Sequence, residues 1–187
     1  MNFMNSLTLV ADSGSDTASE EADDASTNEG VDNEIGYLHP QHSVSAVRRL
    51  QFCAGHRVFK HESKCHRLHG HNYVAFFHAQ SAAGLDSLGR VIDFGVLKEK
   101  LSEWISDNWD HGFILWKQDY DAISAINKLD GQQIFLLPTN PTAENMAAYL
   151  LNVVAPAVLN GTGVVVNKIV LWETENCFVE VVLNAGL

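Results

Sequence analysis

The segment KCHRLHGHNYV, residues 64–74, concentrates residues that bind metal ions and move protons. Within seven positions it holds Cys65 and three histidines, of which His69 and His71 are separated only by Gly70. Side chains alternate along a strand, so these two histidines point to the same side, about 7 Å apart. Two imidazoles at that spacing can converge on one ion at metal–nitrogen distances of about 2.0–2.1 Å. The segment therefore predicts a metal site with a thiol beside it.

A third metal ligand has to come from another residue, and two candidates compete for that place. His56 ends the preceding predicted strand on the face that carries Phe52, so an antiparallel neighbour would bring it beside the histidine pair. Cys65 is the alternative, because a thiolate binds zinc well. Three histidines with an open fourth position are typical of a catalytic zinc site, although imidazoles also suit iron, nickel and copper.

The three cysteines are expected to differ in role. Cys65 has polar neighbours, including Lys64 and Arg67, and a thiol beside a dication is also a candidate base or nucleophile. Cys53 and Cys177 are instead expected to be small buried side chains within strands. Three widely spaced cysteines do not predict a disulfide framework.

Two further places carry candidate acid–base or ligand-binding groups. Asp110 precedes His111 just after a predicted helix, and a carboxylate beside an imidazole can orient the ring in a proton relay. The alternative is a pair that forms local hydrogen bonds at a helix end. Glu173 closes an apolar run, where its carboxylate either anchors a ligand through N–H donors or marks where the strand meets water.

The elements that must position these residues follow the order strand, strand, helix, helix, strand, strand. Period-two patterns predict strands over 43–56 and 69–81, and two more over 163–175 and 177–184. Hairpins in place of crossovers predict an α+β domain with an antiparallel sheet and two helices on one face.

Apolar residues recur at helical spacing in two stretches, one after the first pair of predicted strands and one before the second pair. The predicted buried stripe of the first helix is Phe94, Leu97, Leu101, Trp104 and Ile105. The predicted buried stripe of the second is Met146, Leu150, Val153 and Ala157. Either Asn140, with Pro141 at the first helical position, or Thr142 caps this second helix. The intervening stretch 117–137 has no regular period.

Charge and composition narrow the class of protein. The net charge is −11, but residues 1–43 hold nine acidic residues and no Lys or Arg, which leaves the remainder near −2. Residues 1–42 are predicted to be a disordered acidic tail, because they cannot bury enough apolar surface to order, and 43–187 form one domain. No basic patch indicates nucleic-acid binding, and no apolar run indicates a signal peptide or membrane helix, so a cytoplasmic protein is expected.

Six motifs stand in an order that matches one family: FCAGH, CHRLHGHNY, VIDFGVLK, WDHGFIL, NPTAEN and VLWETE. With them, residues 43–183 resemble the 6-pyruvoyl-tetrahydropterin synthase and 6-carboxytetrahydropterin synthase family. The resemblance implies the tunnelling fold, a four-stranded antiparallel sheet with two helices. It also implies a homo-oligomer, a hexamer or tetramer, with active sites at subunit interfaces.

The resemblance further implies a role for each candidate residue. The implied roles are zinc binding for His56, His69 and His71, general base for Cys65, a second acid–base group for Asp110 and His111, and pterin binding for Glu173 and the backbone near Thr142. The implied small-molecule substrate is 7,8-dihydroneopterin triphosphate. Candidate cations for its triphosphate are Arg57, Lys60, Lys64 and Arg67, and a solvated basic loop is the alternative explanation for them.

The form of the cysteine and histidine motif resembles the carboxy-forming lyases more closely. Those enzymes produce 6-carboxytetrahydropterin, acetaldehyde and triphosphate on the route to deazaguanines such as the queuosine precursor. The alternatives are a 6-pyruvoyl-tetrahydropterin synthase and a zinc- and pterin-binding module without catalysis.

Overall fold

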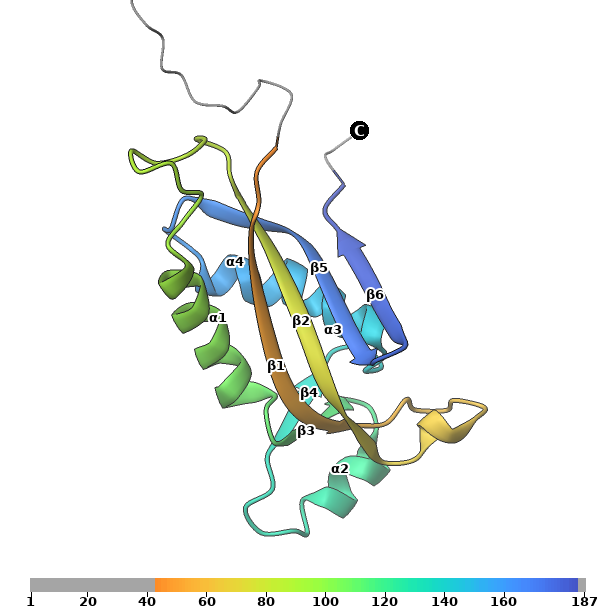
Figure 1. Cartoon of the computed structure of the whole chain (residues 1–187). Coiled ribbons are helices and arrows are strands. Elements are labelled where there is room, and N and C mark those ends of the chain that lie inside the picture. Colours follow the sequence, from red (N-terminus) through yellow and green to blue (C-terminus); the bar gives the residue numbers. More distant parts are fainter. Residues whose placement is uncertain (1–42, 185–187) are drawn as a thin grey trace, which may run out of the picture. The chain divides into compact units, whose positions relative to one another are not determined.

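The computed structural model describes residues 43–184 (Figure 1), so the predicted acidic tail, residues 1–42, lies outside the described residues. The four predicted strands are present, and they pair antiparallel in the order β1-β2-β5-β6. Their bounds are β1 (Ala46–His56), β2 (His69–Ser81), β5 (Val164–Thr174) and β6 (Cys177–Val182). The α+β class is therefore confirmed.

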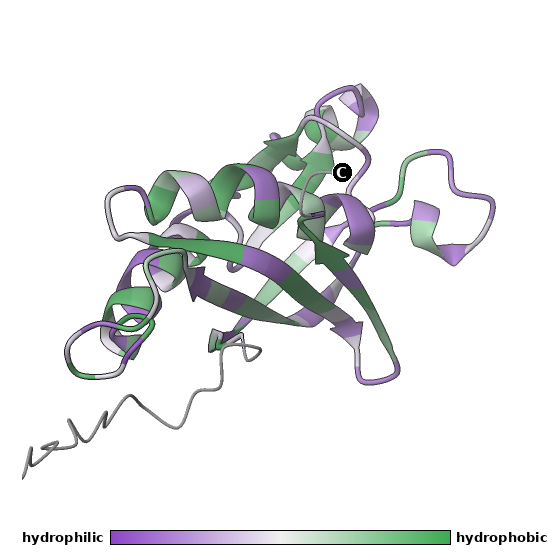
Figure 2. Cartoon of the chain, turned by 90° about the horizontal axis from the view of Figure 1, so that it is seen from above, coloured by the Kyte–Doolittle hydropathy of each residue, from purple (hydrophilic) through white to green (hydrophobic). Residues whose placement is uncertain are grey.

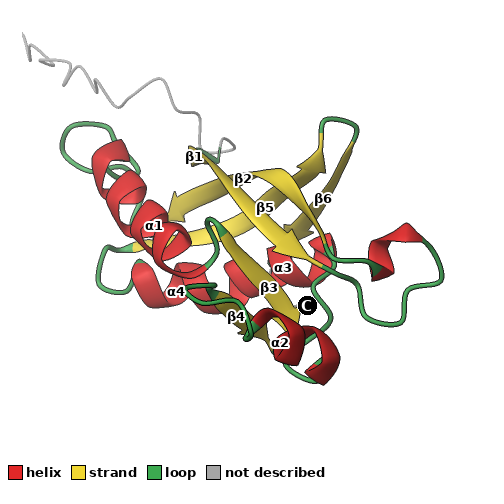
Figure 3. Ribbon diagram, turned by 90° about the horizontal axis from the view of Figure 1, so that it is seen from below, coloured by secondary structure: helices red, strands yellow, loops and turns green. Residues whose placement is uncertain are grey.

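The prediction of a sheet with four strands, all antiparallel, was wrong in both the number and the direction of the strands. The sheet has six strands in the order β4-β3-β1-β2-β5-β6, and the added strands β3 (Gly112–Trp116) and β4 (Ile134–Leu137) both run parallel to β1 (Figure 3). The helix α2 (Tyr120–Ile126) connects them. Both strands are short apolar runs without alternation, and such runs carry no period-two signal in the sequence.

Two helical segments pack on one face of the sheet, as predicted. They are α1 (Phe94–Asn108) and the continuous run of α3 (Ala143–Tyr149), the π-helical segment η2 (Leu150–Val154) and α4 (Ala155–Val158). Leu101 of the first and Leu150 of the second are fully buried in the same core as Phe77 of β2. None of the helices within residues 43–184 is long and apolar enough to cross a membrane.

The buried stripe of α1 differs from its prediction at one end. Leu97, Leu101 and Ile105 are buried, but Phe94 is 60% exposed. The buried residues recur every four positions, so the residue one turn before Leu97 is Asp93, not Phe94. Asp93 caps the helix by accepting a hydrogen bond from the backbone N–H of Gly95 at 2.7 Å.

The second helical segment changes its buried face partway along. Met146 and Leu150 are fully buried as predicted, but Val153 is 47% exposed and Val154 is buried in its place. The reason is the π-helical turn at Leu150–Val154, which accommodates an extra residue and shifts the face of everything after it. At its start Thr142, not Asn140, is the N-cap, and its side chain accepts from the backbone N–H of Asn145 at 3.3 Å.

Candidate metal centre and active site

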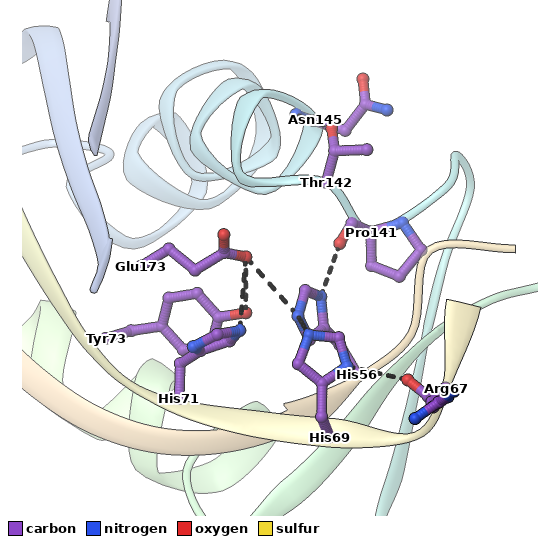
Figure 4. Close-up of polar contacts among 9 residues, drawn as sticks. All are labelled: His56, Arg67, His69, His71, Tyr73, Pro141, Thr142, Asn145 and Glu173. Carbon is purple, nitrogen blue, oxygen red and sulfur yellow. Dashed lines mark hydrogen bonds and ion pairs between the residues drawn. The ribbon is translucent and has the colours of Figure 1, made fainter. Parts of the chain in front are cut away.

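The pairing of β1 with β2 brings three histidines together at one end of the sheet. His56 is opposite His69, and His71 is opposite Ala54, so all three side chains lie on the helix-covered face. Their nearest ring nitrogens all lie within 4.8 Å of one another (Figure 4). Of the two candidates for the third ligand, His56 and not Cys65 belongs to this cluster within the described residues.

Two backbone carbonyls fix the orientation of the histidine rings. The Nδ1 of His56 lies 2.8 Å from the carbonyl oxygen of Pro141, and the Nδ1 of His69 lies 2.8 Å from that of Arg67. A carbonyl oxygen can only accept, so each Nδ1 donates and each neutral ring carries its lone pair on Nε2. These two Nε2 atoms are 3.2 Å apart, and two facing lone pairs at that distance require a shared cation or proton.

Burial favours the neutral, metal-binding form of two histidines of the cluster, because it lowers the pKa of His56 and of His71. Burial lowers the pKa of His56 to about 4, with smaller contributions from the charges of His69 and His71, against the opposing effect of the Pro141 hydrogen bond. Burial also lowers the pKa of His71, whose Nε2 is buried with no hydrogen-bond partner. An orphaned ring nitrogen beside two facing lone pairs is the donor set that a metal ion satisfies.

Glu173, at the end of β5, lies beside the histidine cluster. Its Oε1 is 3.5 Å from Nε2 of His56, 3.8 Å from Nε2 of His71 and 3.5 Å from the hydroxyl of Tyr73 (Figure 4). Burial first, and then the charge of Glu173, raises the pKa of Tyr73, so this phenol stays a hydrogen-bond donor. The carboxylate is therefore directed at the metal-binding end of the site.

A cavity of about 410 Å³ adjoins this cluster at His56 and brings four of the eight predicted site residues together. Its walls include His56, Cys65, Thr142 and Glu173, which come from four separate segments of the chain. Cys65 lies on the short 3₁₀ turn between β1 and β2, and Thr142 lies at the start of α3. One concave space thus combines a histidine of the cluster, a cysteine and a glutamate.

The same cavity includes residues that the sequence analysis did not select. They are chiefly Glu144, Cys177 and Phe178. Cys177 was expected to be buried but is exposed, because β6 is an edge strand and its first residue lies at the hairpin turn. The sequence ETENC, residues 173–177, could have indicated that Cys177 lies near the site, since a hairpin turn right after Glu173 places Cys177 near that residue.

Asp110 and His111 lie elsewhere in this chain. His111 and Cys53 line a second cavity of about 390 Å³. Cys53 was also expected to be buried but is exposed, and it alternates with Ala54 and His56 along β1. This second cavity therefore opens mainly over the face of the sheet opposite the histidine cluster, and His71 of that cluster also borders it.

The Asp110 and His111 pair is nevertheless well defined. Nδ1 of His111 lies 3.0 Å from Oδ2 of Asp110, and the other carboxylate oxygen of Asp110 accepts from the backbone N–H of Cys53 at 2.8 Å. The backbone N–H of His111 donates to the carbonyl of Cys53 at 2.7 Å. His111 has a φ of 58°, a left-handed conformation that is uncommon for a residue with a side chain. The carboxylate and the imidazole are therefore in contact, as both the proton relay and the local helix-end pair require.

The fold and the site define a class of protein: an α+β domain with a three-histidine cluster able to hold a metal ion at the end of its sheet, beside a cavity with a thiol and a carboxylate. Sequence comparison agrees with this class. The family model described as 6-pyruvoyl tetrahydropterin synthase matches residues 45–183.

Curated relatives match over nearly their whole length. The chain is 44% identical to the 6-carboxy-5,6,7,8-tetrahydropterin synthase of Rickettsia felis over 138 residues, covering 74% of this chain and 99% of the relative. It is 43% identical to the synthase of the same name from Rickettsia conorii, with the same coverage. The protein belongs to the 6-pyruvoyl tetrahydropterin synthase family and is an enzyme of the lyase type found there.

Solved structures agree at the level of the fold. An uncharacterized protein from Wolinella succinogenes superimposes with a TM-score of 0.62 at 22% identity, covering 75% of this chain and 98% of that chain. The 6-pyruvoyltetrahydropterin synthase of Plasmodium vivax superimposes with a TM-score of 0.54 at 22% identity, covering 74% and 98%.

Proposed function

We propose that this protein is a zinc-dependent 6-carboxytetrahydropterin synthase. Its substrate would be 7,8-dihydroneopterin triphosphate, which with one water gives 6-carboxy-5,6,7,8-tetrahydropterin, acetaldehyde and triphosphate on the route to deazaguanines. The observation that carries the proposal is that the cluster of His56, His69 and His71 adjoins a cavity that is lined by His56, Cys65 and Glu173. The names of the relatives at 43–44% identity favour the carboxy-forming reaction over the pyruvoyl-forming one.

The residues of this chain would divide the work of binding and proton transfer. The orphaned Nε2 of His71 and the facing Nε2 atoms of His56 and His69 would hold the zinc ion. When bound, zinc supplies a Lewis acid that makes the hydroxyls of the substrate side chain more acidic. Cys65, in the wall of the same cavity, would remove a proton from a carbon of that side chain.

Glu173 and the start of α3 would hold the pterin ring. All three contacts of the Glu173 carboxylate use Oε1, which leaves Oε2 to accept N–H groups of the ring. Thr142 lines the cavity next to this carboxylate, and its backbone would provide further polar contacts. Tyr73 donates to Glu173 and would keep the carboxylate oriented for this purpose.

The second acid–base group would come from a neighbouring copy. His111 faces a cavity on the other side of the sheet from Cys65, so the two cannot act on one substrate within one chain. β1 pairs with β3 only at Ala54–His56, and the backbone of Cys53 is bonded to Asp110 and His111. This leaves the edge of residues 46–52 free among the described strands, and β6 is an edge strand as well. Free edges of this kind favour pairing between copies, so we propose a homo-oligomer with shared active sites.

The direct test is to incubate zinc-loaded protein with 7,8-dihydroneopterin triphosphate and to measure acetaldehyde and the pterin product. Acetaldehyde with 6-carboxytetrahydropterin is expected. A pyruvoyl product without acetaldehyde would reassign the reaction to the other branch of the family. Unchanged substrate with zinc confirmed would reject catalysis and leave a zinc- and pterin-binding module.

A variant at Cys65 separates a chemical role from a structural one. Cys65→Ala should abolish turnover while zinc content and binding of the pterin remain as in the unaltered protein. Cys177→Ala is a matched control, because Cys177 lines the same cavity and has no assigned role in the reaction. Turnover that survives in Cys65→Ala would remove this thiol from the mechanism.

A further inference from the structure

The loop between β1 and β2, residues 57–68, projects from the end of the sheet and is mostly hydrophilic (Figure 2). It carries four basic side chains other than histidine, and one of them is already engaged. The guanidinium of Arg57 forms a two-pronged ion pair with the fully buried carboxylate of Asp119, and that hydrogen bond raises the pKa of Arg57. Arg57 therefore acts in the fold and is not available to a ligand.

The other three cations of the loop have no ionic partner. Lys60, Lys64 and Arg67 are exposed, and none of them forms a salt bridge within residues 43–184. The same loop contributes Val58 and Cys65 to the wall of the active-site cavity. We call Lys60, Lys64 and Arg67 the cationic lip, because their loop forms one wall of that cavity.

The cavity itself is unsuited to a polyanion. Its walls include the carboxylates of Glu144 and Glu173, and no Lys or Arg is among the described residues that line it. A triphosphate carries several negative charges, and placing it between these carboxylates would be opposed by electrostatic repulsion. A substrate that binds its pterin ring in the cavity must therefore extend its triphosphate out of it.

The loop is held firmly enough to present its cations at fixed places. The side chain of Asn140 accepts from the backbone N–H of Phe59 at 2.8 Å and donates to its carbonyl at 2.9 Å. The backbone N–H of Val58 donates to the carbonyl of Cys65 at 2.8 Å, which closes the loop across its base. Lys60 has a φ of 63°, and such a left-handed residue persists only where its surroundings impose it.

We propose that the cationic lip binds the triphosphate of the substrate, an inference that rests on the proposed function. Lys64 directly precedes Cys65, and Arg67 follows two positions later, so phosphate binding on both sides holds the thiol against the substrate side chain. The triphosphate is remote from the reacting carbon, but its binding energy thus helps to position the thiol at that carbon. Free triphosphate, the released product, competes for the same place.

The test compares charge-removing and charge-preserving substitutions. Lys60→Gln, Lys64→Gln and Arg67→Gln should each raise the KM for 7,8-dihydroneopterin triphosphate and the Kd for inorganic triphosphate by about threefold to tenfold, since exposed ionic contacts are modest one by one. The triple variant should multiply these losses. Lys64→Arg should retain most of the affinity. Zinc content is measured in every sample, because free triphosphate chelates zinc.

Two controls make the assignment specific. Lys128→Gln removes an exposed lysine that follows α2, and should leave both constants unchanged. Unphosphorylated 7,8-dihydroneopterin should bind the triple variant as tightly as the unaltered protein. Equal weakening of this ligand, or a triple variant that binds inorganic triphosphate normally, would overturn the proposal. If the unaltered protein binds triphosphate through these three residues but turns over no substrate, the proposed role of the cationic lip is supported and the proposed function is rejected.

Discussion

At the scale of single residues, hydrogen bonds at Nδ1 set the orientation of the His56 and His69 rings. Because Pro141 and Arg67 provide only carbonyl oxygens, His56 and His69 both direct lone pairs at one point. His71 adds a third nitrogen that has no hydrogen-bond partner among the described residues. A cation at that point would relieve both unfavourable arrangements, so a bound metal should contribute to folding as well as to chemistry.

The first prediction concerns the ligand set. His71→Ala should lower zinc affinity by more than about 100-fold, because it removes one of the three histidines that cluster within the described residues. His78→Ala is the matched control, since His78 lies on the same strand but faces the other side of the sheet. Competition with a chromogenic chelator measures both affinities. Similar zinc affinity in the two variants would contradict the three-histidine site.

The second prediction concerns pH and the metal-free protein. The pKa of His56 is about 4 in the fold and near 6.5 in the unfolded chain. Between these values the unfolded state binds a proton that the folded state excludes, so stability falls as pH falls through this window. Lowering the pH from 7 to 5 should cost about 2 kcal/mol through this one group.

Urea unfolding with a chelator present measures this pH effect. His56→Gln should remove most of this part of the pH dependence, because glutamine does not titrate. His66→Gln should leave it unchanged, since that side chain is exposed. A His56→Gln variant that still loses as much stability between pH 7 and 5 would place the effect in other groups.

At the scale of elements, the unit β3-α2-β4 extends the sheet beside the end of β1. Its link to the site is Asp119, which caps α2 by accepting from the backbone N–H of Ala122 and also binds the guanidinium of Arg57. Arg57 directly follows the metal ligand His56. Through this ion pair, the β3-α2-β4 unit therefore holds the end of β1 that carries His56.

The third prediction tests this link. Asp119→Ala should destabilise the protein by about 2–4 kcal/mol, because it leaves the largely buried Arg57 without its partner and removes a helix cap. Asp121→Ala, two residues further into α2 and exposed, should change stability by less than about 0.5 kcal/mol. Chemical denaturation of both variants gives the comparison. Equal stability of the two would show that the ion pair contributes nothing.

The elements also show which parts of the fold can be predicted from the sequence. β1 and β2 alternate strictly, so their faces, and with them the shared side of His56, His69 and His71, follow from the period alone. The exposure of Val153 could not be predicted, because the π-helical turn is set by packing and not by a local pattern. The parallel strands β3 and β4 likewise depend on pairing with β1, which no short apolar run specifies.

The candidate site divides in the same way. Local spacing pairs His69 with His71, but the place of His56 depends on strand register, and that of Glu173 on the neighbouring pair of strands. The exposure of Cys53 and Cys177 was missed because a cysteine in a strand gives no indication of whether its face is covered.

At the scale of the whole molecule, the catalytic candidates are split between two faces of one sheet. Cys65 belongs to the cavity over the histidine cluster, while His111 belongs to the cavity on the opposite face. The sheet lies between the two cavities, so we propose that a second copy brings its His111 to a given Cys65. On this proposal, assembly would be a requirement of the reaction and not only of stability.

The last prediction follows from this separation. Cys65→Ala and His111→Ala should each be inactive alone, yet unfolding and refolding them together in equal amounts should restore activity. If each site takes Cys65 from one copy and His111 from its neighbour, random mixing leaves about one quarter of the sites with both groups intact. Refolding each variant separately and mixing afterwards, without exchange of subunits, is the control and should restore nothing. Co-refolded mixtures that remain inactive, although both variants assemble and bind zinc, would place both groups in the same chain.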